Sequence, residues 1–234
     1  MEDRTLVRIG AASAVLGAII TVIGNVMYPR VDDVDDVQEL ATEIAGSDVW
    51  IGTHFGLMIG VVLILGGLIA LARTITGENG RALARLGLAA ALVSTAVFAV
   101  LMAIDGPGVK QAADAWADAA ASGIDQKSAL NVVDVMTTSM AAVFSVWIVI
   151  GLGLTYVFFG LAVALSDVYY KWLGWAGALL GVIGAVIGLI QFYEGIDDTL
   201  TNVVFPIVAT LVLVWVAAMG VLMYRDTLKS SAPA

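Results

Sequence analysis

Long runs of apolar residues, separated by short polar segments, occur six times along this chain. Each run is about as long as the roughly 20 residues that an α-helix needs to cross a bilayer, and none carries a charged residue in its middle. The pattern predicts an all-α bundle of six transmembrane helices, which form one membrane domain over residues 1–225 before a tail at 226–234. We expect the spans at about 6–27, 49–72, 83–104, 138–165, 172–192 and 200–224.

The composition fits this interpretation. Hydrophobic residues make up 60% of the chain and the mean hydropathy is +0.97, which is too apolar for a soluble domain of 234 residues. The absence of cysteine excludes disulfides, a thiolate nucleophile and cysteine-ligated metals.

Charged residues divide unevenly between the two sides of the six spans. The side with both chain ends and the turns at 73–85 and 167–171 carries more basic than acidic residues. The other side holds most of the acids of a chain with formal net charge −9, mainly in the loops 28–48 and 105–137. Because cytoplasmic loops are enriched in Lys and Arg, we expect both termini in the cytoplasm and the acidic loops outside.

The excess of Asp over Glu, together with a sequence pI near 4.3, is typical of proteins from halophiles. We therefore expect the protein in the cell membrane of a halophilic archaeon. An actinobacterium with a GC-rich genome is the alternative. The acids lie on the predicted outer side, where a saline medium would be met, and this placement favours the halophile.

The first outer loop predicts an amphipathic helix over 31–48, because apolar residues recur there every three or four positions and Gly46 follows as a stop. Its acids lack the glycine and the spacing of a calcium loop. We interpret them as a solvated face, with weak cation binding as the alternative, and predict no metal site.

The second outer loop predicts a second amphipathic helical segment. Asp105-Gly-Pro-Gly108 is a typical turn sequence, and an Ala-rich helix over 109–121 follows, ended by Ser122-Gly123. Residues 125–138 then predict a helix that leads into the fourth span.

Small residues form stripes on several spans, and such stripes allow close contact between helices in a membrane. The stripes of the second and fifth spans are Gly52, Gly56, Gly60, Gly174, Gly177, Gly181, Gly184 and Gly188. A similar stripe on the first span consists of Gly10, Ser13, Gly17 and Gly24. We favour packing within the chain, because six helices offer many internal partners, with a homo-oligomer through these faces as the alternative.

Two spans carry residues that disturb a regular helix. Gly151, Gly153 and Thr155 predict a loosened middle of the fourth span, and Pro206 predicts a kink in the sixth. Residues 86–92 also resemble residues 173–179, which is consistent either with a duplicated hairpin or with chance similarity between Gly- and Ala-rich helices.

His54 is the single histidine of the chain, about one turn inside the outer end of the second span. An ionisable residue at such a position is a candidate functional group. We expect it to join other polar residues in an outward-facing cup, and the further candidates for binding a ligand or proton are Asp105, Lys110, Asp114, Asp134, Gln191 and Glu194. Either His54 forms a proton-responsive pair or cation site with Asp105 or Asp134, or it is a structural residue satisfied by a threonine, a carboxylate or water.

Several functions are excluded by the residue inventory. One histidine is too few for a bis-histidine haem or a multi-histidine zinc site. No lysine lies within a span, and neither a P-loop nor a basic patch for nucleic acid is present. We therefore predict no catalytic residues and no cofactor, haem included.

Two motifs, Trp50-x-x-x-His54 and Asp105-Gly106-x-x-x-Lys110-x-x-x-Asp114-x-Trp116, resemble those of multi-pass prokaryotic membrane proteins of no known activity. The resemblance covers spans two to five. It implies the same six-helix architecture and one group of residues on the outer face: His54, Asp105, Lys110, Asp114 and Trp116.

From these features we expect a non-enzymatic accessory or binding component of the membrane, whose acidic outer face binds a protein partner, a lipid or a small ligand. The alternative is a small transporter or an ion- or proton-coupled channel that uses the polar cup around His54. An enzyme is the third possibility.

Overall fold

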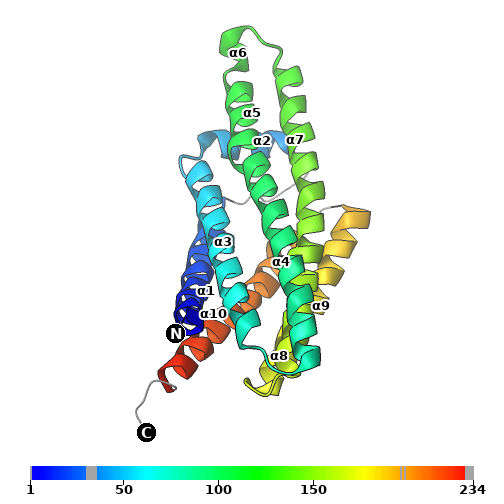
Figure 1. The fold of residues 1–234 in the computed structure, drawn as a ribbon. Helices are drawn as coiled ribbons and strands as arrows, with labels where there is room; N and C mark the ends of the chain where they lie inside the picture. Colours follow the sequence, from blue (N-terminus) through cyan, green and yellow to red (C-terminus); the bar gives the residue numbers. More distant parts are fainter. Residues whose placement is uncertain (1, 30–35, 196, 198, 230–234) are drawn as a thin grey trace.

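The computed structural model describes residues 2–29, 36–195, 197 and 199–229, and within these ranges the chain is helical and forms no strand (Figure 1). Six helical segments are long and apolar enough to cross a membrane. These are Arg4–Met27, Trp50–Thr74, Glu78–Ala117, Gln126–Ala164, Lys171–Glu194 and Leu200–Leu228. The protein is thus an all-α, multi-pass bundle, as the hydropathy pattern predicts.

The helices follow one another along the chain as α1 (Glu2–Met27), α2 (Val37–Gly46), α3 (Trp50–Thr74), α4 (Glu78–Ala103), η1 (Ile104–Gly108), α5 (Val109–Ala117), α6 (Ala119–Ser122), α7 (Gln126–Trp147), η2 (Ile148–Leu154), α8 (Thr155–Ala164), α9 (Lys171–Glu194), η3 (Leu200–Val204) and α10 (Phe205–Lys229). The three η segments are π-helices, with hydrogen bonds that span five residues instead of four.

The long helices form two groups. Helix α1 packs closely against α3 and α10, whereas α8 packs against α4 and α9, and α9 also contacts η2. The α3–α4 hairpin connects the two groups, and the chain ends lie away from α2 (Figure 1). We call the end of the bundle that carries α2 the α2 end; α5 and α6 extend beyond it.

The predicted turn at Asp105–Gly108 is wrong. The chain stays helical there through η1, so that Glu78–Ala117 is one continuous helical segment. Pro107 lacks an N–H and its ring would clash within a regular α-helix, and the wider π-turn accommodates both effects. The two glycines serve packing: a Cβ atom on Gly106 would lie 3.0 Å from the Cβ atom of His54, and one on Gly108 would lie 2.9 Å from Met136 Cε.

Helix α2 lies where the first outer loop predicts an amphipathic helix, although residues 31–35 of that prediction fall outside the described residues. The Asp36 carboxylate caps the helix by accepting hydrogen bonds from the N–H groups of Gln38 and Glu39. The buried Ala41 and Ile44 hold α2 in contact with α5 and α7.

The disturbed regions of the fourth and sixth spans are π-helical. The hydroxyl of Thr155, at the start of α8, donates a 2.9 Å hydrogen bond to the carbonyl of Ile150 in η2, five residues earlier, in agreement with the predicted loosening. Segment η3 ends at Val204, two residues before Pro206 in the sixth span. These wide turns absorb local irregularity without ending the helices.

The glycines of α9 lie against α8 and η2 of the same chain. A Cβ atom on Gly181 would lie 2.8 Å from the carbonyl carbon of Tyr156, and one on Gly188 would lie 2.7 Å from Val149 N. In the same way, Gly174 lies against the backbone of Ala164, and Gly184 lies against that of Leu152. Gly177 instead faces the Trp215 ring of α10. On the other side of the bundle, a Cβ atom on Gly17 of α1 would lie 2.7 Å from the carbonyl oxygen of Gly60 in α3.

The predicted packing stripe of α3 is wrong for Gly52 and Gly56, which have no neighbouring atom within 4 Å of a Cβ position. Residues spaced strictly by four drift about 40° around a helix at each step. The contact with α1 follows alternating steps of three and four instead, through Gly60, Ile64 and Gly67, and so leaves the two outer glycines on an open face.

Gly181→Ala should destabilise the protein by about 1–3 kcal/mol, because the added methyl group would push the backbones of α8 and α9 apart. Gly52→Ala is the matched control: the new methyl group meets open space, and alanine is the better helix former by about 1 kcal/mol. Thermal unfolding in detergent measures both effects, and equal midpoints for the two variants would contradict the assigned helix contact.

Candidate functional site

His54 and Asp105 form a buried ion pair at the α2 end of the bundle. His54 Nε2 lies 2.9 Å from Asp105 Oδ2, and the two side chains are only 1% and 6% exposed. The contact joins α3 to η1, which are adjacent in the fold, although His54 and Asp105 are 51 residues apart in the chain. The hydrogen on Nε2 would not point along the line to Oδ2, so the contact is electrostatic and not a linear hydrogen bond.

The other ring nitrogen of His54 donates a hydrogen bond to its own helix. His54 Nδ1 lies 2.7 Å from the carbonyl oxygen of Trp50, and because a carbonyl only accepts hydrogen bonds, Nδ1 must carry a proton. Nε2 is then the ring nitrogen that faces the Asp105 carboxyl.

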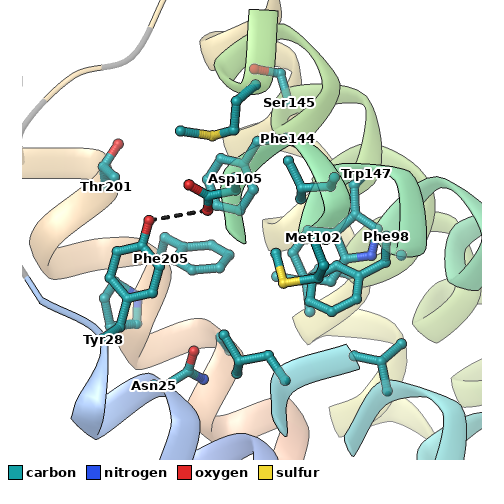
Figure 2. Close-up of a pocket in the computed structure, with 18 of the residues that line it drawn as sticks. Asn25, Tyr28, Phe98, Met102, Asp105, Phe144, Ser145, Trp147, Thr201 and Phe205 are labelled. Carbon is teal, nitrogen blue, oxygen red and sulfur yellow. Dashed lines mark hydrogen bonds between the residues drawn. The ribbon is translucent and has the colours of Figure 1, made fainter. Parts of the chain in front are cut away.

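Two aromatic residues complete what we call the His54 cluster: Tyr28, Trp50, His54 and Asp105. The Tyr28 hydroxyl donates a 3.1 Å hydrogen bond to Asp105 Oδ2 (Figure 2), and the Trp50 indole donates a 2.8 Å hydrogen bond to the backbone carbonyl of Asp105. Desolvation and the neighbouring Asp105 carboxyl raise the pKa of Tyr28 well above its ordinary value, so the phenol keeps the proton that it donates.

The rings of the His54 cluster pack tightly. The His54 ring centroid lies 4.6 Å from that of Trp50 and 5.2 Å from that of Tyr28. The cluster therefore connects the end of α1, the start of α3 and η1 through both hydrogen bonds and ring contacts.

A cavity of about 850 Å³ lies next to the His54 cluster. Its walls come from both helix groups, including α1, α3 and α10 on one side and α4, α7 and α9 on the other. Most of the lining is apolar, and Figure 2 shows an aromatic wall of Phe98, Phe144, Trp147 and Phe205. The polar lining residues include Asp105, Asp134, Thr137, Thr138, Ser145, Gln191, Thr201 and Asn202.

The predicted cup around His54 needs a correction in one respect: His54 does not line this cavity. Tyr28, Trp50 and Asp105 do, and His54 contacts each of them. The imidazole lies behind the residues that line the cavity, because Gly106 and the neighbouring rings enclose it.

Two buried polar atoms of lining residues have no hydrogen-bond partner among the described residues. The Gln191 side chain is 2% exposed; its Nε2 donates to Thr201 Oγ1 at 3.0 Å, but its Oε1 is unpartnered. Trp147 Nε1 is unpartnered as well. Burying such a group without a hydrogen bond costs about 1–3 kcal/mol. Both positions therefore favour a molecule that forms hydrogen bonds within the cavity.

The remaining candidate residues lie apart from the His54 cluster. Lys110 pairs with Asp114 one turn along α5, and its Nζ also donates a 3.1 Å hydrogen bond to the carbonyl of Ala45 at the end of α2. Trp116 packs with apolar residues of α2 and α7. Glu194 is exposed at the end of α9 and is not part of the cavity lining.

The sequence did not indicate that Tyr28 and Trp147 belong to the site, nor that the Trp50 indole donates a hydrogen bond there. One signal was present for Trp50, which precedes His54 by one helical turn and so shares its face. Tyr28 and Trp147 meet the site only through the tertiary fold.

In the part of the chain that the structure describes, no group of three or more His, Cys, Asp or Glu side chains is arranged to hold a metal ion. Comparison with protein-family models, with curated proteins and with solved structures finds no match to this chain.

His54→Ala and Asp105→Ala should each destabilise the protein by about 3–5 kcal/mol, because each leaves a buried group without its partner. The double variant should lose clearly less stability than the sum of the two single losses. Asp114→Ala is the control: it breaks a pair whose carboxylate is 48% exposed and should lower the stability by about 1 kcal/mol or less. Thermal or chemical unfolding provides this double-mutant cycle, and additive effects would disprove the coupling.

Proposed function

We propose that this chain is a membrane protein that binds a lipophilic small molecule in the cavity between its two helix groups. The observation that carries the proposal is the cavity itself: about 850 Å³, largely apolar, with a few polar groups. Ligand sites typically enclose about 300–1,000 Å³ and combine these two kinds of lining. The unpartnered Gln191 Oε1 supports a bound molecule, because it is left without a hydrogen bond inside the wall.

Exposed residues in the lining support access from the surrounding lipid. Val22 and Val26 of α1 line the cavity although they are 38% and 79% exposed, and the exposed Thr210 of α10 lines it as well. The cavity thus reaches the outside of the bundle beside α1 and α10. A lipophilic molecule would enter sideways from the bilayer without crossing water.

The uneven charge of the loops supports an orientation with the α2 end outside and both termini in the cytoplasm. In this orientation the cavity extends from the outer end of α3, at Trp50, past the middle of the bundle to Leu68. The acidic composition supports a halophilic archaeal source, whose saline medium would meet the acidic α2 end.

Ala141→Trp should abolish binding of a lipophilic probe, because Ala141 of α7 lines the cavity and an indole there would fill part of it. Val135→Trp is the control, since Val135 lies on the same helix, is 65% exposed and is not part of the lining. Binding of a nitroxide-labelled alkyl chain in nanodiscs, measured by quenching of tryptophan emission, tests this. Equal quenching in both variants and the wild type would refute the proposal.

A second candidate function is proton-coupled transport, and the buried His54–Asp105 pair beside the cavity favours it. Paired ionisable side chains inside a membrane protein mark proton pathways in many pumps and transporters.

If transport occurs, His54→Ala should abolish proton-coupled flux in reconstituted liposomes, whereas Asp114→Ala should keep it, because Asp114 lies outside the His54 cluster. A pH-sensitive dye inside the liposomes measures the flux. Its absence in the wild type, or its persistence in His54→Ala, would eliminate this candidate.

A further inference from the structure

We infer that the molecule bound in the cavity is an amphiphile with a cationic head, of the long-chain alkylammonium type, and not a fatty acid or another anionic lipid. This inference rests on the proposed function and adds the chemical class of the ligand. It is carried by the charges and the unpartnered hydrogen-bonding atoms of the cavity wall.

The charged lining residues are acidic. Among the described residues, the lining contains Asp105 and Asp134 but no Lys or Arg. The Asp105 charge is compensated within the pair with His54. Asp134 of α7 lines the cavity, is exposed and forms no ion pair with any described residue, so its negative charge is uncompensated. An ammonium head would be attracted to this position and a carboxylate head repelled.

The surroundings of the cavity at the α2 end strengthen this preference. Val37 and Leu40 of α2 belong to the lining, and the same helix exposes Glu39 and Glu43. The nearby Lys110 offers little compensation, because Asp114 and the Ala45 carbonyl occupy its ammonium group. A region lined by one sign of charge, with apolar walls, raises the local concentration of ions of the opposite sign.

The unpartnered atoms agree with a head group that donates hydrogen bonds. Gln191 Oε1 is a buried acceptor without a donor, and an ammonium or hydroxyl group would supply one, whereas a carboxylate would not. Trp147 Nε1 is a donor and needs one acceptor, for which a hydroxyl or amide oxygen on the ligand suffices.

The aromatic wall accepts both parts of such a molecule. The Phe98 and Trp147 rings lie 4.7 Å apart and the Phe144 and Phe205 rings 5.0 Å apart, and all four residues line the cavity. Ring faces attract ammonium and alkylammonium groups and also pack well against methylene chains.

Three nitroxide-labelled chains of equal length, with an ammonium, a hydroxyl or a carboxylate head, provide the test in zwitterionic nanodiscs at pH 8. The quenching that is lost in Trp147→Phe reports binding in the cavity, as distinct from general partition into lipid. We expect the ammonium chain to bind at least about tenfold more tightly than the carboxylate chain, which corresponds to about 1.4 kcal/mol. Asp134→Asn should reduce this ratio to about threefold or less.

Asp118→Asn is the matched control, because it removes one exposed carboxylate that does not line the cavity and should leave the ratio unchanged. Equal binding of all three chains, or tighter binding of the carboxylate, would overturn the head-group inference and leave the binding function intact. An unchanged ratio in Asp134→Asn would overturn it as well. No Trp147-dependent quenching by any chain would overturn both the inference and the proposed function.

Discussion

The whole bundle depends on close approach between helix backbones. In a bilayer, apolar side chains gain no hydrophobic energy from leaving lipid for a neighbouring helix, so association relies on contact at short range. Glycine provides that contact where Gly17 of α1 meets Gly60 of α3, and where Gly181 of α9 meets the backbone of η2 and α8. Each helix group is thereby held as a tightly packed unit.

The cavity follows from the same constraint. Between the two groups the facing residues are large and aromatic, such as Phe98, Phe144 and Trp147, and they keep the backbones apart. Tight packing inside each group and wide spacing between the groups leave a space that runs from the α2 end past the middle of the bundle. The His54 cluster spans the edge of this space, because it connects α1 and α3 of one group to η1, which continues α4 of the other.

The sequence predicts the parts of this structure that depend on composition and period. The six apolar runs predict the six long helices, and Gly151 and Gly153 predict the irregular region of the fourth span. The turn at Asp105–Gly108 fails as a prediction because local Gly and Pro preference is overridden when a buried carboxylate and a neighbouring helix hold the chain helical. The cavity and the hydrogen bond from Tyr28 to Asp105 arise from segments far apart in the chain, and no local pattern encodes them.

The contacts of His54 bear on its two interpretations, as a proton-responsive group or as a structural residue. Its ring is satisfied on one side by the Trp50 carbonyl and faces a carboxylate on the other, so it has a clear structural role. Its place beside a cavity that reaches the outside of the bundle leaves room for a second role.

The π-helical turns have a consequence for how sequences of this type should be compared. A π-turn holds one more residue than an α-helical turn, so the helix beyond it is rotated by about 100° relative to an uninterrupted one. Residues before and after η1 therefore belong to two different helical wheels, although they lie in one continuous helix. A relative without the π-turn would align with this chain only if a one-residue gap were placed inside an apparently unbroken apolar segment.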